Sequence, residues 1–214
     1  MNIERFMTRN PVIGTTKMSI PDASALMKRE KVQRLPILDE NEHLVGMLSE
    51  KDILNAAPAS INPLSLQEVA FMISRLSVSK LMKKEVMSVG KETTVEEASR
   101  LMVDQDISCL PVLENEKLIG VLTTSDLFKV LLELFGVRHY GIRISFLVED
   151  KVGTIARISE KLAKENIDII TLGTFSGTDT SNAILSLKVQ GATKEKLVEV
   201  IQPLVSEILD IQEV

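Results

Sequence analysis

The stretch L-V-G-M-L-S-E-K-D at residues 44–52 returns at residues 118–126 as L-I-G-V-L-T-T-S-D. In both copies an apolar run contains a glycine, a hydroxyl residue follows three positions later, and an aspartate follows three positions after that. A match of the chain with itself over so specific a pattern indicates an internal repeat.

Two further matches lie upstream at one constant offset. D-A-S-A-L-M at 22–27 corresponds to E-A-S-R-L-M at 97–102, and L-P-I-L at 35–38 corresponds to L-P-V-L at 110–113. The one residue that the second copy lacks before the third match falls in a polar turn, where a change of length costs least. The three matches keep their order and register, so the chain contains a tandem repeat.

Each copy predicts a β-α-β-β-α unit. Amphipathic helices are expected at 21–31 and 94–105, each followed by two short apolar runs around a charged turn, which is typical of a buried β-hairpin. A second helix is expected from near Lys51 and from near Ser125. Between the copies, the apolar spacing over 64–76 predicts another amphipathic helix, which would pack on the repeat pair.

The remaining third of the chain has a different pattern. The expected order is strand, helix, two strands, helix and strand, which is the split β-α-β arrangement. The expected elements are strand 141–148, helix 153–165, strands 167–175 and 183–189, a helix capped by Thr193, and strand 208–214. The predicted fold class is therefore α+β, with a tandem pair of repeats followed by a C-terminal β-α-β-β-α-β domain.

Composition excludes several classes of protein. The 214 residues carry a net charge of -5, whereas a general nucleic-acid binder needs a basic face. Aromatic residues make up only 3% of the chain and there is no Trp, which leaves little for stacking on bases. No apolar run is long enough to span a membrane, the N-terminus lacks a signal-peptide pattern, and the single Cys fits a reducing compartment. We expect a cytoplasmic protein.

No catalytic or metal-binding motif is present. The chain contains neither a phosphate-binding P-loop nor a G-x-G-x-x-G run. His43 and His139 have no Cys or second His at metal-ligand spacing. Cys109 lies in an apolar run and is interpreted as a small hydrophobic residue rather than a nucleophile. We therefore predict that the protein is not an enzyme, holds no metal and requires no cofactor.

The repeated G-x-x-[ST]-x-x-D pattern is the best candidate for a binding element. A helix N-terminus attracts phosphate through its free N–H groups and its dipole, and a Ser or Thr there adds a hydroxyl donor. An Asp one turn later can accept the two hydroxyls of a ribose. The alternative is that Ser49 and Thr123 only cap their helices. Two copies at matched register favour a ligand.

The repeats resemble a tandem pair of CBS domains, the Bateman module. The resemblance rests on M-T-x-x-P-V at the start, L-P-[IV]-L-[DE] on the hairpin and G-h-h-[ST]-x-x-D, where h is apolar, at the second helix. The C-terminal segment resembles an ACT domain through D-K-V-G-T-I at 150–155, with Val and Ile where Pro and Leu are frequent. In order and size the chain is similar to the AcuB-like family of bacterial acetoin utilisation. The implied domains are CBS repeats at 1–60 and 78–135, a connecting helix at 61–77, and an ACT-like domain at 136–214.

The CBS resemblance implies two clefts, each combining the hydroxyl-Asp element of one repeat with walls from the other. Cleft 1 would contain Thr8, Ile13, Val32, Gln33, Thr123, Ser125 and Asp126. Cleft 2 would contain Lys83, Ser88, Ile107, Ser108, Ser49, Lys51 and Asp52. The ACT resemblance implies a ligand loop of Asp150, Val152, Gly153 and Thr154, for which a plain tight turn is an equally weighted alternative.

The implied function is that of a regulatory sensor. Adenine nucleotides (AMP, ADP or ATP) would bind in the CBS clefts, and a small molecule such as an amino acid would bind at the ACT domain. The output would be a changed homodimer or a changed interaction with a protein partner, with a link to acetoin catabolism. The alternative is a regulatory subunit of a metabolic enzyme whose catalytic domain is on another chain. No nucleic acid or membrane is expected as a partner.

Overall fold

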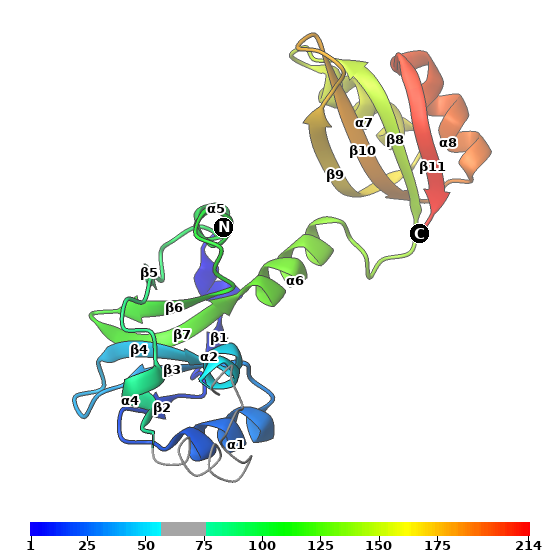
Figure 1. Ribbon diagram of the computed structural model, residues 1–214. Coiled ribbons are helices and arrows are strands. Elements are labelled where there is room, and N and C mark those ends of the chain that lie inside the picture. Colours follow the sequence, from blue (N-terminus) through cyan, green and yellow to red (C-terminus); the bar gives the residue numbers. More distant parts are fainter. Residues whose placement is uncertain (57–75) are drawn as a thin grey trace, which may run out of the picture. The chain divides into compact units, whose positions relative to one another are not determined.

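The computed structural model describes residues 1–56 and 76–214, which form two compact units, Met1–Leu127 and Phe128–Val214 (Figure 1). Residues 61–75 of the expected connecting helix lie outside the described residues. The domain bounds expected from the sequence stay a prediction.

The first repeat forms a three-stranded sheet with a helix before and after its hairpin. Helix α1 (Ile20–Glu30) is capped by Ser19, whose hydroxyl accepts the Asp22 N–H at 3.2 Å. Strand β2 (Gly14–Thr15) pairs in parallel with β3 (Arg34–Leu38), which pairs in antiparallel with β4 (Leu44–Ser49). Helix α2 (Glu50–Asn55) follows β4 directly.

The second repeat has the same sequence of elements. It begins with α4 (Val78–Leu81) and β5 (Val89–Gly90), and α5 (Val95–Asp104) is capped by Thr94. The hairpin consists of β6 (Cys109–Glu114) and β7 (Lys117–Thr123), and α6 (Thr124–Leu134) follows. The tandem β-α-β-β-α arrangement predicted from the repeat is therefore present.

The entry segments of the two repeats are exchanged. Strand β1 (Thr8–Arg9), which follows the short helix η1 (Ile3–Arg5), pairs with β7 of the second repeat instead of with its own hairpin. The equivalent segment of the second repeat pairs with β4 of the first, through Met47 N–H to Lys83 O and Lys83 N–H to Met47 O, both at 2.9 Å. The sheet order β1-β7-β6-β5 therefore contains a strand from each end of the unit (Figure 1).

The two apolar cores of this unit also contain the exchanged segments. Ile3 and Met7 are buried with α5, β6 and β7 of the second repeat. Val78, from the start of the second repeat, is fully buried with α1, β3 and β4 of the first. Neither repeat can complete its apolar core alone, so the two form one folding unit.

The repeated glycine permits the close approach of each exchanged segment. A Cβ on Gly120 would lie 3.0 Å from the Thr8 carbonyl oxygen and 2.7 Å from the Met7 sulfur. A Cβ on Gly46 would lie 3.0 Å from the Lys83 carbonyl oxygen. The glycine in each copy of the motif is thus explained by strand exchange, which the sequence alone did not reveal.

Gly120→Ala is expected to lower the free energy of unfolding by about 1–3 kcal/mol, the usual cost of an extra methyl in a packed site. The conflict is with backbone on β1, which cannot move away without breaking its pairing with β7. Gly90→Ala is the matched control, since a Cβ there meets nothing within 4 Å. Urea unfolding of both variants measures the difference. Equal stability of the two would contradict the close-approach explanation.

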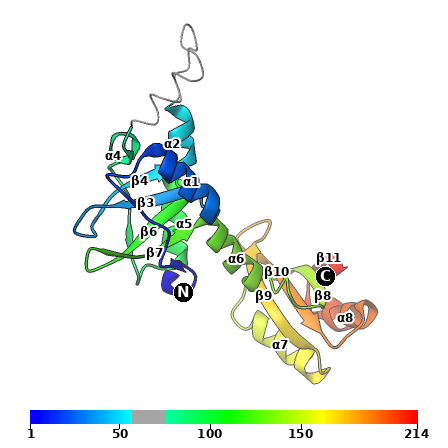
Figure 2. The same cartoon turned by 90° about the horizontal axis from the view of Figure 1, so that it is seen from below.

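The second unit is a four-stranded antiparallel sheet with two helices on one face. The order along the sheet is β11-β8-β10-β9, and α7 and α8 lie on the same side of it (Figure 2). This is the predicted split β-α-β topology. The elements are β8 (Ile142–Glu149), α7 (Thr154–Lys164), β9 (Asp168–Ser176), β10 (Asn182–Gln190), α8 (Lys194–Ile201), η2 (Gln202–Leu204) and β11 (Glu207–Glu213).

The segment that leads into β8 is fixed to the other face of this sheet. Lys188 is 1% exposed, and its Nζ donates to the Gly136 carbonyl at 3.0 Å. Arg143 donates to the Phe135 carbonyl at 3.0 Å. Burial, with the nearby Arg143 charge, lowers the pKa of Lys188. Two cations thus bind successive carbonyl groups of this segment.

Candidate functional site

Each copy of the repeated motif forms a capping box. Ser49 Oγ donates to Asp52 Oδ2 at 2.5 Å, and the Asp52 N–H donates back to Ser49 Oγ at 3.2 Å. Thr123 and Asp126 make the same pair of bonds at 2.7 and 3.3 Å. In both boxes the Asp carboxylate also accepts the backbone N–H of the capping residue. The hydroxyl groups are thereby held at the ends of β4 and β7.

Asp126 is 3% exposed, and its replacement by Ala should lower the free energy of unfolding by about 1–2 kcal/mol, as the loss of a helix cap does. Asp52→Ala is the matched control, because Asp52 makes the same bonds but is partly exposed. We expect a smaller loss for it. Urea unfolding compares the two, and an Asp126→Ala protein as stable as the parent would contradict the capping role.

Cleft 1 is a cavity of about 620 Å³ inside the first unit. It combines the cap of the second repeat with β1 and the α1–β3 loop of the first. Five of the seven residues expected there line it: Thr8, Val32, Gln33, Thr123 and Ser125. Ile13 is 41% exposed and lies outside the lining, and the buried Asp126 also does not line the cavity.

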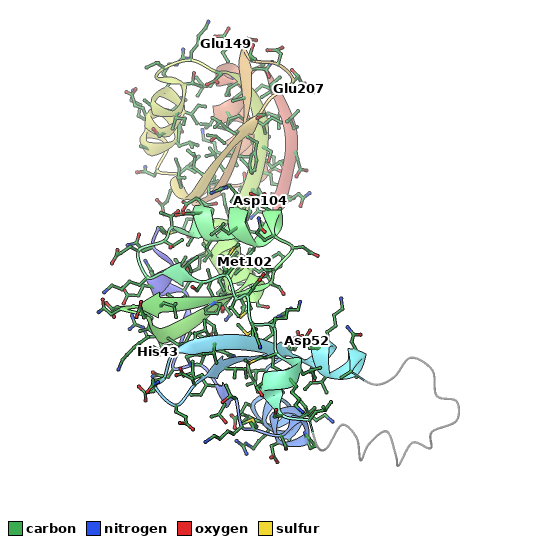
Figure 3. All side chains as sticks on the ribbon, turned by 60° about the vertical axis from the view of Figure 1, so that its left-hand side comes forward. His43, Asp52, Met102, Asp104, Glu149 and Glu207 are labelled. Atoms are coloured by element: carbon green, nitrogen blue, oxygen red, sulfur yellow. The ribbon has the colours of Figure 1, made fainter. Side chains whose placement is uncertain are left out.

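Cleft 2 is a cavity of about 840 Å³ in the same unit. It combines the cap of the first repeat with the entry segment and the α5–β6 loop of the second. Six of the seven expected residues line it: Ser49, Lys51, Asp52, Lys83, Ile107 and Ser108. Ser88 does not. Figure 3 places Asp52 on α2, at the far end of β4 from His43, so His43 takes no part in this cleft.

Charge distinguishes the two clefts. Cleft 1 is lined by the cations Lys31 and Arg34 and by one carboxylate, Glu30. The cations of cleft 2 are Arg34, Lys51 and Lys83, and its carboxylates are Asp52, Glu85 and Asp106. Cleft 2 therefore has one more cation than cleft 1 but also two more carboxylates, so its lining has no formal net charge, whereas the lining of cleft 1 is positive by one charge.

Sequence reasoning missed Arg34 and Cys109, each of which lines both clefts. They occupy equivalent positions, at the starts of β3 and β6. The repeat register could have revealed them, because both precede the L-P-[IV]-L run. Cys109 is partly rather than fully buried; burial raises the pKa of its thiol to about 11, and the nearby Arg34 charge opposes that rise. A thiol with so high a pKa is a poor nucleophile at neutral pH.

The second unit has its own cavity of about 720 Å³ beside the β8–α7 loop. Of the four loop residues expected there, Asp150 and Thr154 line it, and Val152 and Gly153 do not. Val152 points fully into solvent, and Gly153 has φ of 90°, a left-handed conformation that favours glycine at the start of α7. Thr154 is 5% exposed and donates to the Glu149 carbonyl at 3.1 Å. Phe175 and Asn182 also line this cavity.

Residues 1–56 and 76–214 contain neither a metal-binding cluster nor a membrane-spanning helix. No group of three or more His, Cys, Asp or Glu side chains there could hold a metal ion. No helix of these ranges is long and apolar enough to cross a membrane.

The repeated fold and its paired clefts define a known class. The CBS domain family matches residues 3–59 and 78–133. The chain therefore belongs to the CBS domain family and carries two copies of the domain.

Among curated relatives, the magnesium transporter MgtE of Thermus thermophilus is 31% identical over 126 residues, covering 58% of this chain and 23% of the transporter. Inosine-5'-monophosphate dehydrogenase of Bacillus subtilis is 27% identical over 182 residues, covering 81% of this chain and 34% of the enzyme. The chain thus spans about a third or less of the length of these relatives.

Two solved structures are similar over almost their whole length. One is a protein from Vibrio cholerae named for acetoin utilization (AcuB), with a TM-score of 0.55 and 28% identity, covering 64% of this chain and 95% of that chain. The other is CBSX2 in complex with AMP, with a TM-score of 0.52 and 28% identity, covering 64% of this chain and 98% of that chain.

Proposed function

We propose that this chain is a non-catalytic regulatory sensor that binds adenine nucleotides (AMP, ADP or ATP) in clefts 1 and 2. One observation carries the proposal: two cavities occupy equivalent places in the tandem repeat, each joining the hydroxyl cap of one copy to the loop wall of the other. The AMP complex of CBSX2, which has the same paired-domain fold, supports this class of ligand.

The cleft residues suggest how a nucleotide would be held. In cleft 1 the hydroxyl groups of Thr8, Thr123 and Ser125 would bind phosphate, and the walls at Val32 and Gln33 would receive the base. Asp126 would act through Thr123, whose hydroxyl it holds. This differs from the expectation that Asp126 contacts the ribose itself, because its side chain is buried in the cap.

In cleft 2, Asp52 lines the cavity and would accept the ribose hydroxyls, next to the base walls at Ile107 and Ser108. Lys51 and Lys83 would bind the additional phosphates of ADP or ATP. We therefore propose that cleft 2 prefers the triphosphate and that cleft 1 accepts AMP. Ile13 and Ser88 have no role in this arrangement.

For the second unit we propose an ACT-like domain that binds a small molecule, such as an amino acid, beside Asp150 and Thr154. The support is the split β-α-β topology and the cavity next to the N-terminus of α7, whose free N–H groups can receive a carboxylate. One alternative is that the loop is a plain tight turn and that this unit only dimerises.

We propose that ligand binding changes a homodimer or changes the interaction with an unidentified protein partner. We also propose that the protein is cytoplasmic and requires no cofactor. The similarity to AcuB supports a link between this output and acetoin utilisation. MgtE and inosine-5'-monophosphate dehydrogenase are much longer than the region that they share with this chain. The match to one segment of an enzyme, inosine-5'-monophosphate dehydrogenase, supports a second candidate, a regulatory subunit of a metabolic enzyme whose catalytic domain lies on another chain.

Native mass spectrometry of freshly purified protein tests the proposal. Copurifying AMP, ADP or ATP at up to two molecules per chain is expected, and the same spectrum reports whether the protein is a dimer. After nucleotide has been removed, addition of AMP or ATP should restore the bound species. Protein that takes up neither nucleotide would contradict the proposal.

A further inference from the structure

Clefts 1 and 2 share part of their lining. Arg34, Ser108 and Cys109 contact both cavities, and Arg34 is the one cation among them. The other lining cations each belong to a single cleft, Lys31 to cleft 1, and Lys51 and Lys83 to cleft 2. Arg34 therefore stands where the two sites meet.

The guanidinium of Arg34 is available to a ligand. The side chain is partly buried, and it makes no hydrogen bond or ion pair with any residue in 1–56 or 76–214. Its charge reaches the Cys109 thiol, which places it close to the equivalent position of the other repeat. A partly desolvated arginine without a carboxylate partner is suited to receive an anion.

The two repeats differ in the residue at this equivalent position. The position equivalent to Arg34 is Cys109, a neutral thiol, so the pair of clefts contains one guanidinium instead of two. A guanidinium binds a phosphate through a planar fork, and a fork turned toward one ligand cannot present the same N–H groups to another.

We propose that Arg34 is a phosphate-binding side chain shared by the two clefts, so that a nucleotide in one cleft withdraws it from the other. The inference rests on the proposed function and adds a regulatory property to it: occupancy of the two clefts is antagonistic. The first nucleotide binds with the help of Arg34, and the second binds without it.

Methyl NMR of the full chain, labelled at Ile and Val, can follow each cleft separately during a titration with ATP or AMP. Val32 and Val121 line cleft 1 only, and Ile107 and Val86 line cleft 2 only. In the parent protein we expect saturation of one cleft to lower the nucleotide affinity of the other by about 5–150-fold, an ordinary range for coupled sites.

Arg34→Gln should lower the nucleotide affinity of both clefts. Because the shared group is gone, saturation of one cleft should then change the affinity of the other by less than about twofold. Arg34→Lys keeps the charge but not the fork and should restore part of the affinity. Lys31→Gln and Lys51→Gln are matched single-cleft controls, and each should weaken its own cleft while the coupling persists.

Independent clefts in the parent protein, or coupling that survives Arg34→Gln, would overturn the inference while leaving nucleotide binding intact. Absence of any nucleotide-dependent shift in the parent protein would instead contradict the proposed function. The unchanged methyl spectrum of each variant without nucleotide verifies that it is folded.

Discussion

Replacing Lys51 and Lys83 together by Gln is expected to weaken ATP binding in cleft 2 by about a hundredfold. Both lysines line this cleft, and hydrogen bonds to charged groups contribute about 1.5–3 kcal/mol each. Because both side chains are exposed, we take the lower end of that range, which is about one decade of affinity for each lysine. AMP, which has a single phosphate, should lose less. Isothermal titration calorimetry with ATP and AMP measures both losses.

Lys28→Gln with Lys84→Gln is the matched control for this double variant. It makes the same change of charge with two exposed lysines that do not line cleft 2. ATP affinity should stay within about twofold of the parent value, because exposed charges at a distance are screened by salt. An equal loss in both double variants would mean that bulk charge, and not phosphate contact, accounts for the effect.

Phe146→Ala is expected to destabilise the second unit by about 3–5 kcal/mol, the usual cost of deleting a buried aromatic side chain. Phe146 is fully buried in the centre of β8 and packs in the core formed with α7 and α8. Clefts 1 and 2 lie wholly within Met1–Leu127, so nucleotide affinity should not change.

Hydrogen exchange read by mass spectrometry follows the two units separately. Peptides from β8 to β11 should lose protection in Phe146→Ala, and those from β3, β4, β6 and β7 should keep it. Leu209→Ala on β11 is the control, because Leu209 is 46% exposed and its loss leaves no cavity. If Phe146→Ala lowers nucleotide affinity when it destabilises the second unit, the assignment of both clefts to the first unit would be contradicted.

Much of this organisation could be predicted from the repeat. The register between residues 44–52 and 118–126 implied matched hairpins and matched helix starts, and both are present. It also implied that Ser49 and Thr123 cap those helices, since a hydroxyl residue between a strand and a helix is a local signal. Local patterns of this kind survive folding because they involve residues only a few positions apart.

The parts that could not be predicted depend on tertiary packing. Ile13 and Ser88 are close in sequence to lining residues, but they do not line the cavities. The Asp126 pattern is identical to that of Asp52, but the first is buried and the second lines a cleft. Gly46 and Gly120 looked like part of a ligand motif, and their role is contact with exchanged backbone. Arg34 has no local signal except its register with Cys109.

The most direct test of the account is a calorimetric titration of ATP into nucleotide-free protein. We predict saturable binding with up to two molecules per chain, reduced at cleft 2 by the Lys51 and Lys83 replacements and unaffected by Phe146→Ala. Protein whose folding is verified by its methyl spectrum, but which binds neither ATP nor AMP at millimolar concentrations (about 4 kcal/mol of binding free energy), would contradict the central claim that the paired clefts are nucleotide sites.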